Sequence, residues 1–353
     1  MSPEEGTGHE WGSRLWRDAA ENWAHLQLDR LGFRPAGAMS DLSDQRWSWV
    51  WRIPTNRGDV LLKQTTSAMN VEGSVHTLCA DAAPEYVDRP LAYDPATARI
   101  LFTDGGPTMG EASQSPEGPS PEAVASMVTD YAHLQHATIG RQRQAEAAGL
   151  PAWDPAGAAH EAEQLAGILH ALPRSDPRRI TALQKDLLLT NLDALTESGT
   201  VLVNSPIPSC VDHGDLWPGN VLAARTPGGH HRFIDFGDAA WTHPFLSLMA
   251  PLFECHRRWS LPGPFSDSLN HPSLQMIIDS YLQAWTDYAS LQELRDILSH
   301  ALRLTPLRRS WALVTNVKHA TSADADDLGP TPWSWLTAAT PSCTKEPRPM
   351  GDR

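Results

Sequence analysis

Three polar side chains are spaced as the transfer of a phosphoryl group would require. Asp215 and Asn220 stand five positions apart in the segment 213–220, which reads His-Gly-Asp-Leu-Trp-Pro-Gly-Asn, and Asp235 follows in a run Ile-Asp-Phe-Gly. This chemistry needs little covalent help from a protein, but it needs an aligned hydroxyl and a Mg²⁺ ion that neutralises the phosphates. We expect Asp215 to orient the hydroxyl and take its proton, and the side-chain oxygens of Asn220 and Asp235 to bind Mg²⁺.

Short apolar runs around these residues predict the strands that position them. Val211 precedes the first motif, residues 221–222 follow it, and residues 233–234 precede Asp235, with a Thr-Pro-Gly-Gly turn at 226–229. Both aspartates should therefore lie at the ends of neighbouring strands. An aspartate in such a loop often only caps backbone amides. The second motif, which starts soon after the first ends, favours the catalytic interpretation.

The two motifs resemble those of the aminoglycoside phosphotransferase and choline kinase group. The hallmark of that group is a His-Gly-Asp-Leu-x-Pro-Gly-Asn loop followed by Ile-Asp-Phe-Gly-Asp, and this chain matches it at 213–220 and 234–238. The resemblance implies an α+β, two-lobed protein-kinase-like fold. Its small N-terminal lobe would carry an antiparallel sheet, and its larger, mainly helical C-terminal lobe would hold the acceptor. It also implies ATP or GTP as phosphoryl donor, with Mg²⁺.

One departure from the group lies inside the matched stretch of about 210–247. The group commonly continues to a His/Asp-Pro-x-x-Asp-Leu segment, whereas this chain reads His-Pro-Phe-Leu-Ser-Leu at 243–248. Ser247 cannot supply the charge of an aspartate. We therefore expect the catalytic loop to be braced differently here.

A lysine on a β-hairpin is the candidate contact of the donor phosphates. Aromatic residues alternate along 47–53, a turn follows, and a second β run at 60–65 carries Lys63. Glu72 lies nine positions later in a plausible helix, where it could hold the lysine in place. The alternative for Lys63 is a solvent-facing strand lysine. The alternating tryptophans are interpreted as core residues rather than as a stacking surface for a base.

Two further small-lobe segments are candidates for nucleotide binding. Residues 37–46 stand where a phosphate-covering loop belongs but lack the pattern G-x-G-x-x-G, so Ser43 and neighbouring amides are candidate phosphate contacts, with an ordinary polar turn as the alternative. A hinge is expected at 103–107, where glycines permit close approach to a base. A simple connector is the alternative there. The hinge candidates for nucleotide binding are Thr103, Asp104 and Gly105.

The remainder of the chain has mainly helical patterning. Apolar stripes predict helices within 121–134, 158–172, 180–195 and 274–285, and a last helix at 291–304 that ends before Pro306. In the group that the chain resembles, carboxylates of the helical lobe hold the acceptor, although exposed acidic residues usually only face solvent. The candidate acceptor contacts are Asp215, Asp238, Glu254 and Asp279, with Asp287 as a further possibility.

Length and net charge limit the possible domain organisation and partners of the protein. The 353 residues are divided into a nucleotide-binding lobe with hinge (1–106), a helical catalytic and substrate lobe (107–336) and a tail expected to be disordered (337–353). A net charge of −14 argues against nucleic acid or an anionic membrane as partner and is compatible with a cationic substrate. The acidic N-terminus lacks the pattern of a leader, and no long apolar run occurs. We expect a cytoplasmic protein, and nothing indicates its oligomeric state.

Histidines and cysteines indicate no other metal site. His213 is expected to brace its loop, and His230 and His231 stand in a predicted solvated turn without a third ligand at metal spacing. The four cysteines are far apart in the sequence and form no C-x-x-C pair, so they are interpreted as reduced thiols. They are Cys79, Cys210, Cys255 and Cys343.

These observations predict a small-molecule kinase that transfers the γ-phosphate of ATP or GTP to a hydroxyl. An antibiotic of the aminoglycoside, macrolide or nucleoside type is the leading acceptor, for resistance or biosynthesis. The near alternative is a primary-metabolite kinase for choline, homoserine or a sugar. A catalytically silent nucleotide-binding scaffold is a second alternative, which the intact set Lys63, Asp215, Asn220 and Asp235 argues against. A metal-dependent hydrolase is a third, and it lacks further ligands.

Overall fold

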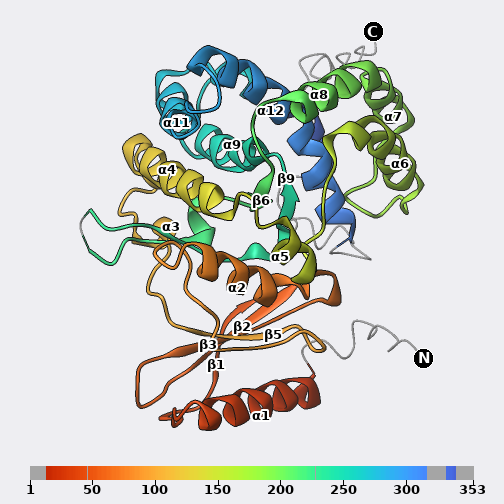
Figure 1. Ribbon diagram of the computed structural model, residues 1–353. Coiled ribbons are helices and arrows are strands. Elements are labelled where there is room, and N and C mark those ends of the chain that lie inside the picture. Colours follow the sequence, from red (N-terminus) through yellow and green to blue (C-terminus); the bar gives the residue numbers. More distant parts are fainter. Residues whose placement is uncertain (1–12, 46, 227, 316–330, 339–353) are drawn as a thin grey trace.

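The computed structural model describes residues 13–45, 47–226, 228–315 and 331–338. It has a small lobe built on one antiparallel sheet and a larger, mainly helical lobe (Figure 1), so the predicted α+β, protein-kinase-like architecture is confirmed. The predicted disordered tail lies outside the described residues, except that 337 and 338 belong to helix α14 (Pro332–Ala338). No helix in the described parts of the chain has the length and apolar character needed to cross a membrane.

The small-lobe sheet has five antiparallel strands in the order β1-β2-β3-β5-β4. The predicted hairpin is formed by β2 and β3, in which Val50 stands opposite Lys63. Residues 37–46, predicted to be a loop, instead contain strand β1, which pairs along the edge of β2 with a register shift between Asp41 and Ser43. The strand bounds are Ser40–Asp44 (β1), Ser48–Ile53 (β2), Val60–Thr65 (β3), Ala92–Asp94 (β4) and Arg99–Thr103 (β5).

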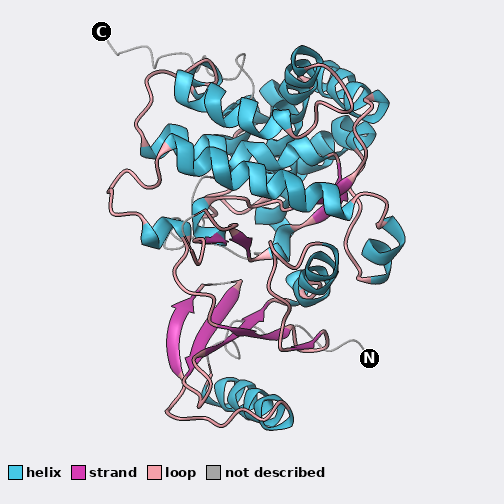
Figure 2. Ribbon diagram, turned by 60° about the vertical axis from the view of Figure 1, so that its left-hand side comes forward, coloured by secondary structure: helices cyan, strands magenta, loops and turns pink. Residues whose placement is uncertain are grey.

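Two helices cover opposite faces of this sheet. Helix α1 (Arg14–Arg30) lies on the face away from the large lobe, and α2 (Glu72–Ala82) lies between the sheet and the large lobe (Figures 1 and 2). Two of the alternating tryptophans, Trp49 and Trp51, form part of the core under α1, as predicted, and the ring of Trp16 in α1 packs 5.1 Å from the ring of Trp51. The small lobe therefore has its own apolar core on one face, which leaves the other face for the site.

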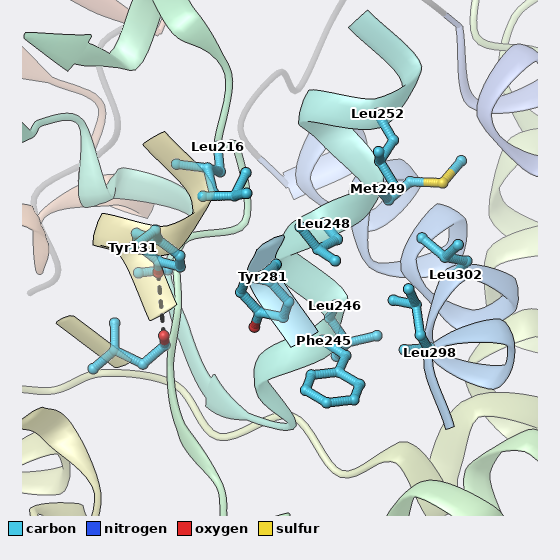
Figure 3. Close-up of a cluster of buried hydrophobic side chains, with 14 of the residues drawn as sticks. Tyr131, Leu216, Phe245, Leu246, Leu248, Met249, Leu252, Tyr281, Leu298 and Leu302 are labelled. Atoms are coloured by element: carbon cyan, nitrogen blue, oxygen red, sulfur yellow. Dashed lines mark hydrogen bonds between the residues drawn. The ribbon is translucent and has the colours of Figure 1, made fainter. Parts of the chain in front are cut away.

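The large lobe is a group of helices above two short two-stranded ribbons. Helix α11 packs along α4. Figure 3 shows the large-lobe core in which Tyr131 of α4 and Tyr281 of α11 lie among side chains from α9 and α12. There the hydroxyl of Tyr131 donates to the carbonyl of Val211 at 3.2 Å. That bond fixes strand β6 (Cys210–Asp212), after which the first motif starts. The helices are α3 (Met109–Ala112), α4 (Pro121–Thr138), α5 (Gln142–Ala147), α6 (Ala158–Ala171), α7 (Ala182–Leu189), α8 (Leu192–Asn204), α9 (Met249–Arg258), α10 (Phe265–Ser268), α11 (Pro272–Gln283) and α12 (Leu291–Thr315).

The two ribbons carry both motifs. Strand β6 (Cys210–Asp212) pairs with β9 (Ala240–Thr242), and β7 (Val221–Leu222) pairs with β8 (Arg232–Phe233). The first motif runs from β6 to β7, and Asp235 follows β8, so both aspartates lie at strand ends as predicted. The predicted solvated turn before β8 is anchored, because His230 and His231 contact the carboxylate of Asp130 in α4 at 3.0 and 2.7 Å.

Two helix predictions were wrong in their extent. The stretch 180–195 is not one helix, because α7 ends and α8 begins around Thr190 and Asn191. Helix α12 does not stop before Pro306 but continues to Thr315, although proline lacks the N–H that a helix interior uses. The added turns are held from outside the helix, for example by Arg178, whose Nη1 donates to the carbonyl of Leu313 at 2.8 Å.

Candidate active site

The loop after β6 places Asp215 and Asn220 in direct contact. The Nδ2 of Asn220 donates to the backbone carbonyl of Asp215 at 2.9 Å and lies 3.2 Å from its Oδ2. Gly214 has φ of +78°, and a Cβ there would lie 2.1 Å from the carbonyl oxygen of Asp238. Only glycine fits this close approach, which brings the start of the first motif against the end of the second.

Strand pairing brings Asp235 beside Asn220. The amide of Ile234 donates to the carbonyl of Asn220 at 3.1 Å, and Asp235 is the next residue. Asp235 has φ of +65°, a left-handed conformation that is uncommon for a residue other than glycine. Behind it, Nε2 of His213 lies 3.0 Å from the carbonyl of Ile234. Burial lowers the pKa of His213, so the neutral ring donates through Nε2, and this histidine braces the loop.

Lys63 joins the small lobe to this loop. Its Nζ lies 2.9 Å from Oε1 of Glu72 and 2.8 Å from Oδ1 of Asp235. The side chain of Glu72 is only 1% exposed. Burial alone would lower the pKa of Lys63, but the carboxylates of Asp235 and Glu72 raise it above its usual range, so the ammonium stays charged. The structure thus brings Lys63, Glu72 and Asp235 together and excludes a solvent-facing lysine.

Two arginines that the sequence motifs do not include also contact the catalytic loop. The Nη2 of Arg309 lies 2.8 Å from Oδ1 of Asp215, and its Nη1 donates to the carbonyl of Gly214 at 2.7 Å. Arg308 donates through Nε to Oδ2 of Asp212 at 2.7 Å. Both come from the turns of α12 beyond Pro306. The sequence signal was an adjacent arginine pair, which carries little information while the helix is expected to end before it.

The departure at Ser247 is explained by Asp212. The hydroxyl of Ser247 donates to Oδ1 of Asp212 at 2.5 Å and lies 3.1 Å from Nε2 of Gln135, which also donates to the carbonyl of Val211. Arg308 completes the arrangement on the other carboxylate oxygen. The carboxylate that braces the loop therefore stands at position 212 in this chain, and Ser247 serves as its hydrogen-bond donor.

Burial changes the pKa of Asp215, the candidate base. Removal from water raises the pKa of Asp215 to about 6, an effect that Arg309 opposes and that the carboxylates of Asp238 and Asp235 reinforce. A carboxylate with this pKa is ionised at neutral pH yet is a stronger base than an ordinary aspartate. Asp215 is thus suited to accept a proton from a hydroxyl.

The oxygen atoms near Asn220 and Asp235 suit Mg²⁺. The atom of Asn220 that contacts Asp215 is its amide nitrogen, so its side-chain oxygen can serve as a metal ligand, and Asp235 has a second carboxylate oxygen beyond the one that Lys63 contacts. Two hard oxygen donors are what this ion takes from a protein when phosphates and water supply the remaining ligands. The described residues contain no cluster of three or more His, Cys, Asp or Glu that could hold a metal by itself.

The hinge candidates lie at the end of β5 and just beyond it. The amide of Asp104 donates to the carbonyl of Asp59 at 2.9 Å, and the carbonyl of Gly105 accepts from Nη2 of Arg232 at 2.8 Å. Thr103 is the last residue of β5. Ser43 lies in β1, close to the turn that leads to β2. Thr103, Asp104 and Gly105 thus lie at or just beyond the end of the strand that pairs with β3, which carries Lys63, whereas Ser43 lies on the edge strand beyond β2.

Two predicted acceptor contacts are engaged elsewhere. Glu254 forms ion pairs with Arg257 and Arg258 of its own helix. Both carboxylate oxygens of Asp279 accept from Nη2 of Arg295, at 2.7 and 2.8 Å. Asp238, in contrast, lies in the site.

A pocket of about 320 Å³ opens beside Asp238. One wall is α12, through residues spaced three and four apart on one helix face, and another is α6. Aromatic rings and two carboxylates line it, and Nε1 of Trp153 donates to Oε2 of Glu161 at 2.7 Å. The lining includes Trp153, Glu161, Gln164, Asp238, Arg308 and Trp311.

Comparison with protein families decides the class of the chain. The model of a family described as the phosphotransferase enzyme family matches residues 110–294, slightly more than half of the chain. The chain belongs to this family. It is accordingly a phosphotransferase that acts on a hydroxyl of a small molecule. The arginine pair of α12 lies beyond the matched residues of this phosphotransferase.

Solved structures with the same fold include several small-molecule kinases. A macrolide 2'-phosphotransferase type I is 14% identical, with 91% of this chain and 95% of that chain covered and a TM-score of 0.56. An ethanolamine kinase of Plasmodium vivax is 14% identical, with 95% and 90% covered and a TM-score of 0.58. The GDP and kanamycin complex of APH(2")-IIia is 13% identical, with 90% and 95% covered and a TM-score of 0.57. At such identities the similarity shows the fold of this phosphotransferase. Among curated proteins no match was found.

Proposed function

We propose that the protein is a Mg²⁺-dependent kinase that transfers the γ-phosphate of ATP or GTP to a hydroxyl of a small acceptor. The observation that carries this proposal is the contact of Lys63 with both Glu72 and Asp235, next to the pair Asp215 and Asn220. Each charged group needed for phosphoryl transfer is present and within hydrogen-bond distance of another.

In this proposal each residue has one role in the reaction. Lys63 contacts the α- and β-phosphates, Glu72 holds Lys63, and Asn220 and Asp235 hold the ion, which when bound neutralises charge on the phosphates. Asp215 accepts the proton of the acceptor hydroxyl as its oxygen forms the bond to the γ-phosphorus and the bond to the β-phosphate oxygen breaks. Ser43 and the hinge residues Thr103, Asp104 and Gly105 are the proposed further nucleotide contacts.

The pocket beside Asp238 is the proposed acceptor site, and its lining favours an acceptor with an apolar face. Trp153 and Trp311 offer aromatic rings, while Glu161 and Asp238 are the two acidic residues of the lining. A polycationic aminoglycoside would require more carboxylates. We therefore favour a macrolide or nucleoside antibiotic, which agrees with the macrolide 2'-phosphotransferase among the structures of the same fold.

A second acceptor class is favoured by the same tryptophans. An indole face beside a carboxylate attracts a quaternary or primary ammonium group, so choline or ethanolamine is the alternative within the primary-metabolite class. An ethanolamine kinase is among the structures of the same fold. Of the predicted acceptor contacts, Asp215 and Asp238 stay proposed, whereas the ion pairs of Glu254 and Asp279 make these two weaker candidates.

Phosphate transfer from γ-labelled ATP and GTP to a panel of acceptors tests the proposal. The panel contains macrolides, nucleoside antibiotics, aminoglycosides, choline and ethanolamine, and Trp311→Ala and Glu161→Gln are assayed beside the wild type. A loss of transfer with Trp311→Ala but not with Glu161→Gln supports an acceptor with an apolar face. An equal loss of transfer with both variants supports an ammonium acceptor. Efficient transfer to aminoglycosides that neither variant changes would contradict this assignment of the pocket.

Location and lobe boundaries are part of the same proposal. The nucleotide donor and the buried free thiols of Cys79, Cys210 and Cys255 suit the reducing cytoplasm. We place the boundary of the nucleotide-binding lobe at 106, with the catalytic and substrate lobe over 107–336.

A further inference from the structure

Helix α12 delivers an arginine to the candidate base from outside the family-matched residues 110–294. We propose that Arg309 is a positioning residue of the reaction, which fixes the carboxylate of Asp215 and balances the negative charge around it. The turns of α12 beyond Pro306 would then be part of the catalytic apparatus. This assignment depends on the function proposed above.

The geometry restrains Asp215 on both oxygens. Arg309 contacts Oδ1 at 2.8 Å, and Asn220 lies 3.2 Å from Oδ2. The same guanidinium donates to the carbonyl of Gly214, the residue before Asp215, at 2.7 Å. A planar guanidinium that bonds to a side chain and to the adjacent backbone restricts rotation of the carboxylate. Each oxygen retains a lone pair for an acceptor hydroxyl.

The charge near Asp215 also requires a cation. Asp215, Asp235 and Asp238 lie close enough to influence one another electrostatically. Lys63 pairs with Asp235, and Arg309 pairs with Asp215 and lies 3.7 Å from Oδ2 of Asp238. Arg309 therefore pairs with one of these three carboxylates and lies near a second, in the place where the loop presents the base.

Helix α14 packs against the guanidinium of Arg309. Its guanidinium carbon lies 5.2 Å from the ring centroid of Trp335 in α14, and its side chain is only 16% exposed. The neighbouring Ser310 contacts the carbonyl of Pro332 at 3.4 Å. The ring face attracts the guanidinium and the carboxylate of Asp215 pairs with it, so both contacts favour this position of the side chain. These contacts give a physical reason for the helix to continue past its proline.

Two other arginines of α12 have contacts that differ from those of Arg309. Arg308 is directed to Asp212, at the base of the loop, and so serves the stability of the loop. Arg303, two turns earlier, donates to Oγ of Ser198 at 3.0 Å and is a control of the same residue type on the same helix. Substitution of Arg303 should leave turnover unchanged.

The test measures Mg²⁺-dependent release of phosphate from ATP and GTP, with water as the acceptor, so that it needs no knowledge of the natural acceptor. Wild type, Arg309→Gln, Arg309→Lys, Arg303→Gln and Asp215→Asn are compared for kcat, for KM of the nucleotide and for melting temperature. We expect Arg309→Gln to lower kcat about tenfold or more with KM changed less than about twofold, as for loss of an interaction at the reacting group. Arg309→Lys should recover part of the loss.

The outcomes separate this inference from the proposed function. Turnover of Arg309→Gln within twofold of wild type, or a loss that Arg303→Gln shares, would overturn the role of Arg309 while Asp215 remains the base. A loss that follows the melting temperature and is not recovered by lysine would also overturn it. Equal turnover by wild type and Asp215→Asn would overturn the proposed function and this assignment with it.

Discussion

The ammonium of Lys63 lies 2.8 Å from the carboxylate of Asp235, although 172 positions separate the two residues in sequence. One stands on a central strand of the small lobe and the other follows a short strand of the large lobe. Their contact connects the proposed phosphate-binding residue to the proposed metal ligand. Loss of either partner should therefore affect the whole site.

Replacement of Lys63 by methionine should impair both stability and activity. It leaves Glu72 buried without its cation, and breaking a buried ion pair in this way costs about 3–5 kcal/mol. We expect a lower melting temperature and a large loss of kcat/KM for the nucleotide. Lys185→Met, in the partly exposed helix α7, is the matched control and should behave as wild type. Unchanged kinetics in Lys63→Met would exclude the phosphate contact.

Asp235→Asn should weaken Mg²⁺-nucleotide binding itself. An amide is a poorer ligand for this ion than a carboxylate, and it no longer pairs with the charge of Lys63. Calorimetric titration should show affinity for Mg²⁺-ATP or Mg²⁺-GTP reduced at least about tenfold, or ~1.4 kcal/mol. If binding of the magnesium nucleotide is retained at full affinity, the metal is held by other residues.

The rate of transfer should depend on an ionisation near pH 6. Burial raises the pKa of Asp215 to about 6, and only the ionised carboxylate can accept a proton. As the pH falls through 6 the base becomes protonated, so kcat/KM for the acceptor should decline on the acidic side and level off above about pH 7. A pH profile of kcat/KM, which reports ionisations of the free enzyme, measures this. A flat profile between pH 5 and 7 would be inconsistent with Asp215 as the base.

Ser247→Asp introduces the aspartate expected at this position from the resemblance described above, but it should destabilise this protein. The hydroxyl of Ser247 lies 2.5 Å from Asp212, so a second carboxylate there would meet a buried like charge. We expect a loss of about 2–4 kcal/mol in the free energy of unfolding, because a buried charge without a new partner is costly. The double variant Asp212→Ser/Ser247→Asp should recover part of it. Denaturant unfolding of the wild type, the two single variants and the double variant measures the coupling between positions 212 and 247. Additive losses of unfolding free energy would argue against such coupling.

The sequence predicted those parts of the site that local patterns encode. The place of Lys63 on a strand, and of the two aspartates after strands, follows from alternating and apolar runs in the sequence. The contact of Lys63 with Glu72 follows from the order of a strand and then a helix. The edge strand β1 was missed because Ser-Asp-Leu-Ser-Asp has the composition of a turn. Its pairing with β2 comes from the neighbouring strand rather than from its own residues.

The contribution of α12 could not be predicted from local patterns. Proline normally ends a helix, and the contacts that offset its cost come from Asp212, Gly214 and Arg178, which are distant in sequence. The partner of Asp279 could not be predicted for the same reason, because Arg295 comes from another helix. The partners of Glu254, in contrast, stand three and four positions later in its own helix, a local spacing that the sequence does contain.

The most direct test of the central claim is mass spectrometry of acceptors incubated with Mg²⁺ and ATP or GTP, with Asp215→Asn in parallel. The account predicts a gain of one phosphate on an acceptor with the wild type and a rate about 10²–10⁴-fold lower with the variant, while the variant still binds the nucleotide. Phosphate transfer by Asp215→Asn at the wild-type rate would contradict the account, because the proton of the acceptor would then pass to another group.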